Sequence, residues 1–175
     1  MRSTTEFSRP FEIAELAKAA LPFEIEATPD ERAAVARRLE LLELPELRAQ
    51  GRVEAAGGGV VRVRGRVVAQ LVQRCVVTLE PVENRVESDF ERLFLRSGGT
   101  ASTLVEVAAE EVDIEPLLGD ILDLGEIVTE ELALVMDPYP RAPHASEYLE
   151  AYTREQDREP PASPLAALLG RRHGD

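Results

Sequence analysis

Tryptophan is absent from this 175-residue chain, and aromatic residues of all kinds make up only 5% of it. A core must therefore be built mainly from valine, leucine, isoleucine and alanine. The shortage of aromatic rings also argues against a base-stacking platform for nucleic acid, because such a platform needs exposed Phe, Tyr or Trp side chains. The length still allows a real core, since a domain of this size buries about 70% of its unfolded surface.

Cysteine is nearly absent as well, because Cys75 is the single one. This excludes an internal disulfide and a cysteine-based zinc site. The surrounding strand pattern predicts a buried structural thiol, and the alternative is a thiol whose pKa is lowered by the adjacent Arg74. The two histidines, His144 and His173, lie far along the chain from Cys75, so no nucleophile–base pair is expected. We predict no catalytic residue, no metal site and no cofactor.

Long hydrophobic runs are missing too. No segment approaches the roughly 20 apolar residues that span a bilayer, and the N-terminus lacks the apolar run of a signal peptide. We therefore expect a cytoplasmic protein with neither a membrane partner nor a small-molecule substrate. The net charge of −13 at pH 7 argues against loose binding to nucleic acid, since that affinity comes largely from neutralised phosphates.

Basic charge is concentrated in residues 51–75, which hold five arginines and one acidic residue. From Val60 onwards, valines alternate with polar residues, which is the period of a strand with one buried face. Arg62, Arg64 and Arg66 fall between the valines, so they leave one face of the strand about 7 Å apart. The alternative is a charged strand that is merely soluble and protected at its edge. We predict an RNA- or anion-binding surface formed by Arg62, Arg64, Arg66 and Arg74.

Acidic charge is concentrated in residues 106–137, which hold eleven acidic residues and no Lys or Arg. Such a block suits a basic partner protein, or it faces the arginines within the molecule. Convergent carboxylates would also hold magnesium, as in a metal-dependent phosphoesterase, but spacing alone does not show convergence. We predict that a basic protein binds Asp113, Glu115, Asp120, Glu126 and Glu130.

Strand-like alternation predicts most of the secondary structure. We expect short strands near Phe7 and at residues 21–26, and longer strands at residues 47–55, at 60–79 and around Phe90. Gly57-Gly58-Gly59 predicts a hairpin turn, because a strand and not a helix follows it. Gly65 predicts a bulge of the kind that lets a sheet curl toward a barrel.

Two helix starts stand out. Thr28-Pro29-Asp30-Glu31 has the pattern of a capping box with proline at the first helical position, which predicts a helix at about 29–42. Asp123 to Glu126 repeats the pattern and predicts a second helix at about 124–136. We therefore expect an α+β fold with an antiparallel, strongly curved, barrel-like sheet flanked by these two helices.

The domain boundary is expected at residue 140. Residues 1–140 would form a single α+β domain. Residues 141–175 are rich in proline and charge, which predicts a flexible tail. The tail ends in a short apolar and basic segment, residues 164–172, which is either a docking peptide or a frayed helix.

The order of several motifs resembles that of the YceD family. The likeness extends over most of the chain, from about Phe7 to Arg172. It rests on the segments Arg74 to Val82, Asp113 to Leu117, Asp120 to Leu134 and Asp137 to Arg141, with a Phe-containing strand after the first of them.

This resemblance implies a non-enzymatic bacterial ribosome-biogenesis factor for the synthesis, processing or stability of large-subunit ribosomal RNA. The implied partner is that RNA or a pre-ribosomal particle. From the acidic block we add a basic large-subunit ribosomal protein as a further predicted partner. Some members of the family carry cysteine pairs that look like a zinc site, but this chain has Pro140 to His144 there, so no metal role is implied. The alternatives are a protein-only adaptor for a basic ribosomal protein and a metal-dependent phosphoesterase.

Overall fold

The computed structural model describes residues 5–16, 20–96 and 114–158 of the chain. The chain divides into two compact units. Unit 1 comprises Met1–Gln73 and Glu83–Pro138, and unit 2 comprises Arg74–Val82 and Tyr139–Asp175. Among the described helices, none combines the length and the apolar composition needed to cross a membrane.

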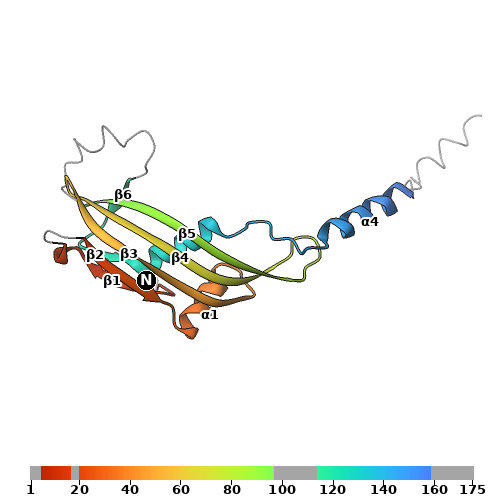
Figure 1. Ribbon diagram of the computed structural model, residues 1–175, viewed down its shortest axis with the longest axis horizontal. Helices are drawn as coiled ribbons and strands as arrows, with labels where there is room; N and C mark the ends of the chain where they lie inside the picture. The colour runs from red at the N-terminus through yellow and green to blue at the C-terminus, as the bar shows by residue number, and fades with distance from the viewer. Residues whose placement is uncertain (1–4, 17–19, 97–113, 159–175) are drawn as a thin grey trace, which may run out of the picture. The chain divides into compact units, whose positions relative to one another are not determined.

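A five-stranded sheet dominates the fold (Figure 1). Its order is β2-β3-β4-β5-β6. Strands β2 and β3 pair antiparallel, as do β3 and β4, but β5 and β6 pair parallel. The sheet is therefore mixed and open, and the predicted antiparallel, barrel-like sheet is wrong. The strands are β2 (Leu21–Glu26), β3 (Glu43–Gly57), β4 (Val60–Arg74), β5 (Pro81–Arg96) and β6 (Ile114–Leu117).

Gly65 does not form the predicted bulge. It pairs with Gly51 of β3 in unbroken register, and the register shifts lie elsewhere, between Glu43 and Glu46 and between Ala55 and Gly57. A Cβ atom on Gly65 would lie 2.7 Å from the ring of Phe90. The missing side chain therefore makes room for a core aromatic ring instead of bending the strand.

The hairpin between β3 and β4 is confirmed. Gly57, Gly58 and Gly59 all have positive φ angles, of 89°, 58° and 82°. Residues with side chains rarely adopt this conformation, so the three glycines permit the tight reversal. A second, two-stranded sheet pairs β1 (Pro10–Glu12) with β7 (Ile121–Asp123) antiparallel.

Helix α1 runs from Pro29 to Arg38, and its predicted capping box is present. It ends earlier than predicted because Glu40 adopts a φ of 55°. The Leu41 amide then donates to the carbonyl of Ala36 at 2.9 Å, which is the closing bond of a Schellman motif.

Helix α3 (Leu124–Val135) agrees with the prediction. Asp123 caps it by accepting hydrogen bonds from the amides of Gly125 and Glu126, at 3.0 and 3.3 Å.

The main core lies on one face of the large sheet. Both helices contribute to it, through Val35 of α1 and through Val128 and Leu132 of α3, all fully buried. The sheet contributes alternate residues, as the strand pattern predicts. These are Leu47, Val53, Val63, Val67, Phe90 and Phe94.

Unit 2 has a small core of its own, in which Cys75 packs with Ala142 and Ala145. Strand β4 ends at Arg74, so the predicted strand to residue 79 is too long. Helix α4 (Ala145–Arg158) lies within the segment expected as a flexible tail. The boundary at residue 140 stays a prediction, and the terminal apolar and basic segment lies outside the described residues.

Candidate nucleic-acid interface

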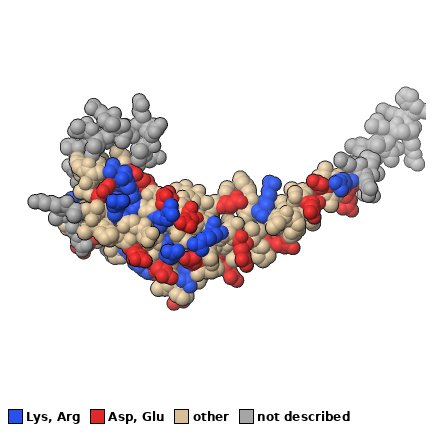
Figure 2. All heavy atoms as spheres, viewed as in Figure 1, with Lys and Arg blue, Asp and Glu red and all other residues tan. Residues whose placement is uncertain are grey.

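The face of the sheet opposite the main core is densely charged, and we call it the charged face. Strand pairing defines its residues, because Glu54 lies opposite Arg62, Arg52 opposite Arg64, and Gln50 opposite Arg66. Basic and acidic side chains are interspersed on the surface seen in Figure 2. The charged face comprises Glu24, Glu26, Arg48, Gln50, Arg52, Glu54, Arg62, Arg64, Arg66, Glu87, Asp89 and Glu91.

Arg62, Arg64 and Arg66 leave the same face of β4, as predicted, but all three form ion pairs. Arg64 Nε donates to Glu91 at 2.8 Å. Arg66 Nε donates to Asp89 at 2.7 Å, and its Nη1 donates to Glu87 at 2.9 Å. The hydrogen bond with Arg66 lowers the pKa of Asp89 below its usual value.

Arg62 lies between two carboxylates. Its Nη1 donates to Glu54 at 3.1 Å, and its Nε lies 3.1 Å from Glu91. That Nε atom is buried and donates no hydrogen bond, so charge and not alignment holds it near Glu91. Each of the three arginines on this face of β4 therefore has at least one carboxylate partner within the chain, and the binding of RNA or another anion by them stays a prediction.

Arg52 differs from these three arginines. It is exposed and has no ion pair among the residues that the structure describes. It lies directly opposite Arg64 in the pairing of β3 with β4. Both arginines line an open hollow of about 470 Å³, together with Gly51, Gly65, Phe90 and the carboxylates of Asp89 and Glu91. Two residues of like charge therefore lie opposite each other beside an open space, and two carboxylates border the same space.

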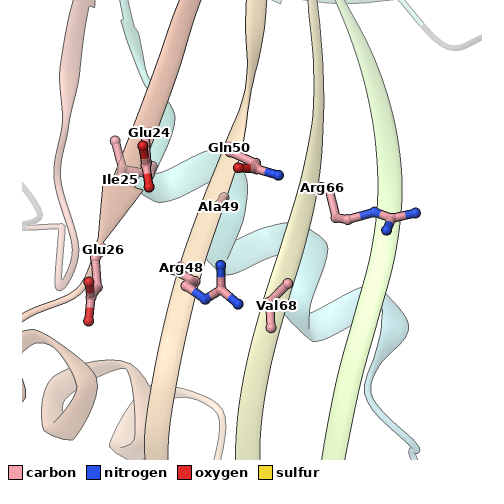
Figure 3. A pocket seen from close by; sticks show the side chains of 8 residues that line it. All are labelled: Glu24, Ile25, Glu26, Arg48, Ala49, Gln50, Arg66 and Val68. Atoms are coloured by element: carbon pink, nitrogen blue, oxygen red, sulfur yellow. The ribbon is translucent and has the colours of Figure 1, made fainter.

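A second and much smaller hollow, of about 70 Å³, lies on the same face between β2, β3 and β4. Figure 3 shows Arg48 and Gln50 standing on β3, with the guanidinium of Arg66 extending from β4 toward β5. Glu24 and Glu26 of β2 line the other side. This hollow has the volume of a few atoms, so we do not assign it a ligand.

The fourth predicted arginine, Arg74, belongs to unit 2. It is exposed and has no ion pair in the described part of the chain. Next to it, the buried Cys75 Sγ accepts hydrogen bonds from the amides of Val77, Thr78 and Ala142, at 3.4, 3.3 and 3.3 Å. Burial raises the pKa of the thiol, but hydrogen bonds from these groups, led by Thr78, lower it to about 6.

The predicted acidic residues are also paired within the chain. Glu126 binds Arg38 through both carboxylate oxygens, at 2.7 and 2.8 Å, and Asp120 pairs with Arg96. Asp113 lies outside the described residues.

Glu115 and Glu130 both bind Arg92, together with the buried Glu131. The Arg92 side chain is only 17% exposed, so this cluster braces β5 against β6 and α3. Of the five predicted residues, four therefore serve internal contacts.

The sequence predictions missed two arginines, Arg52 beside the open hollow and Arg92 in the cluster of glutamates. A hairpin centred on Gly58 places Arg52 opposite Arg64, so counting residues from the turn would have paired them. Arg92 carries no comparable signal, because its partners Glu115, Glu130 and Glu131 are distant in the sequence. Within the described residues, no group of three or more His, Cys, Asp or Glu side chains is arranged to hold a metal ion.

The fold and the charged face define an α+β protein whose candidate site is an open sheet surface suited to contact with a macromolecule. The chain belongs to the YceD family, because the family model described as "Large ribosomal RNA subunit accumulation protein YceD" matches residues 63–169, more than half of its length. The resemblance expected from the motifs is therefore confirmed. That description supports a role in ribosome biogenesis and names no catalytic activity. No curated protein and no solved structure matches the chain.

Proposed function

We propose that this protein is a non-enzymatic ribosome-biogenesis factor that contacts large-subunit ribosomal RNA through the charged face. The observation that carries the choice of surface is the pair Arg52 and Arg64, which lie opposite each other beside an open hollow. Family membership supports the choice of partner, because the family is described by accumulation of large ribosomal RNA.

Like charges directly opposite each other on neighbouring strands are unfavourable. Arg64 relieves part of this repulsion through Glu91 of β5, but Arg52 has no such partner among the described residues. A phosphate between the two guanidinium groups would accept hydrogen bonds from both, and arginine is well suited to that geometry.

The internal ion pairs do not prevent this contact. Pairs between exposed arginines and carboxylates contribute little to stability, so a phosphate exchanges for a carboxylate at small cost. Their presence does keep the face close to electrical balance. Binding is then local and depends on fit, in agreement with a chain whose net charge is −13, because loose binding to nucleic acid needs a broad positive field.

Co-sedimentation with large-subunit precursor particles tests this proposal. Replacing Arg52 and Arg64 by glutamine should weaken association and reduce the dependence of log K on log salt by about 1 for each phosphate that the variant no longer binds. Arg37→Gln is the matched control, because Arg37 is exposed on α1 and has no ion pair among the described residues. Equal binding by the double variant and the control would contradict the proposal.

The predicted arginines Arg62 and Arg66 belong to the same proposal as secondary contacts. Replacing both by glutamine should weaken association less than the Arg52 and Arg64 changes, because Arg62 and Arg66 already have carboxylate partners. Arg74 belongs to unit 2 and has no ion pair among the described residues, so Arg74→Gln is measured separately. Ultraviolet crosslinking in growing cells, followed by identification of what is attached to residues 60–75, locates the contact.

A protein-only adaptor is the second candidate. The interspersed charges of opposite sign on the charged face favour it, since such a surface complements a polar protein surface as well as a phosphate backbone. Crosslinks from residues 60–75 that recover ribosomal proteins without RNA would favour the adaptor over the RNA contact.

A further inference from the structure

Helix α4 presents an apolar stripe to solvent. Tyr148, Leu149 and Tyr152 are 56%, 40% and 54% exposed. Their spacing of one, three and four residues places them on the same side of a helix. Ala145, on the same side, is 1% exposed, so the stripe begins in the small core of unit 2 and continues into solvent.

Phenylalanine and tyrosine are divided between the two units. The five phenylalanines lie in unit 1, where they are buried or packed against the main core. The three tyrosines lie in unit 2, and all are more than half exposed. Tyrosine is enriched in the centres of protein interfaces, because its ring buries a large area and its hydroxyl tolerates water.

The charge on the rest of α4 indicates the partner. Three exposed glutamates, Glu147, Glu150 and Glu155, lie on the described part of the helix. Arg154 is paired with Glu150 at 3.0 Å, which leaves the helix surface negative. A negative helix repels a phosphate backbone and attracts a basic protein.

We infer that α4 is a docking helix, and that its tyrosine stripe binds an apolar groove bordered by Lys and Arg on a partner protein. This is the helix-in-groove mode of recognition. Helices of this length are marginal in water unless they are packed. The start of α4 is packed, since Ala145 lies in the small core with Cys75 and Ala142. Docking would bury the exposed tyrosine rings further along the helix.

Binding of the full chain to two probes tests this inference. The probes are purified large ribosomal subunits and the RNA-free total protein extracted from them. Replacing Tyr148 and Tyr152 by alanine should weaken binding to both probes by about 30-fold or more, the effect of losing an interface hot spot. The Phe variants at both positions should retain binding, and Ser146→Ala, at an exposed polar position of α4, is the control.

Photo-crosslinking from position 149 identifies the contact. We expect attachment to a protein segment whose apolar residues are flanked by Lys or Arg, and Glu147→Gln with Glu155→Gln should slow association and reduce its salt dependence. Attachment to RNA, to a second copy of this chain, or to nothing would overturn the inference. Loss of binding in the Arg52 and Arg64 variants alone would not overturn the inference about α4, because those variants test the charged face.

Discussion

Glu31 ties the N-terminal segment to α1, and its replacement by glutamine should make stability depend less on pH. Its two carboxylate oxygens accept hydrogen bonds from Arg9 at 2.7 and 2.9 Å, and the Thr28 amide donates to one of them at 2.8 Å. Hydrogen bonding from Arg9, aided by Thr28 and opposed by partial burial, lowers the pKa of Glu31 from 4.5 to about 2. Arg9 also donates to the Glu26 carbonyl at 2.9 Å.

The size of the effect follows from this shift. One pKa unit corresponds to about 1.4 kcal/mol, which sets an upper limit of about 3 kcal/mol for the carboxylate. The side chains of Arg9 and Glu31 are 31% and 23% exposed, so water screens part of the interaction, and about 1–2 kcal/mol is expected. Because the pKa of Glu31 is lower in the folded state, this stability is present above pH 4.5 and is lost as the pH falls toward 2.

Urea unfolding followed by far-UV circular dichroism, at several pH values between 2 and 7, measures this contribution. Glu31→Gln should reduce the free energy of unfolding by about 1–2 kcal/mol at pH 7, and the difference from the original chain should disappear near pH 2. Glu83→Gln is the control, since Glu83 is exposed on β5 and has no ion pair among the described residues. A difference that stays constant with pH would refute the reasoning, because it would not come from the charge.

Three further predictions concern stability and reactivity. Replacing Arg92 by methionine should reduce the free energy of unfolding by about 3 kcal/mol, because it leaves the buried Glu131 unpaired, and urea titration measures this. Gly51→Ala should prevent folding, since its Cβ would lie 2.1 Å from the Arg64 carbonyl oxygen. Gly119→Ala lies in open space at a φ of 99°, so it should reduce the free energy of unfolding by only about 1–2 kcal/mol in the urea titration. Iodoacetamide should modify Cys75 slowly at pH 7 despite its lowered pKa, because the thiol is buried, and urea should accelerate the reaction.

Local features of the sequence predicted local structure well. The Thr28 capping box, the cap formed by Asp123 and the hairpin at Gly57 depend on residues within four positions of each other. The architecture of the sheet was not predictable in this way. β6 joins β5 as a parallel strand, and no pattern within β6 itself distinguishes parallel from antiparallel pairing.

In the candidate site too, features set by neighbouring residues were predictable, and features set by strand pairing were not. Strand alternation predicted that Arg62, Arg64 and Arg66 share a face, because side-chain direction follows from the period of two. Their partners Glu87, Asp89 and Glu91 alternate along the sequence in the same way. The pairing between the two rows was missed, because it depends on which strands lie side by side and in what register.

The absence of tryptophan, together with the division of Phe and Tyr between the units, has a practical consequence for spectroscopy. Ultraviolet fluorescence excited at the tyrosine band originates from Tyr139, Tyr148 and Tyr152, all in unit 2. Circular dichroism in the amide region, by contrast, reports on both units, through the long strands, α1 and α3 of unit 1 and through α4 of unit 2. The tyrosine signal therefore follows unit 2 alone without any attached label, and a tyrosine transition that fails to coincide with the amide transition would reveal that the units unfold separately.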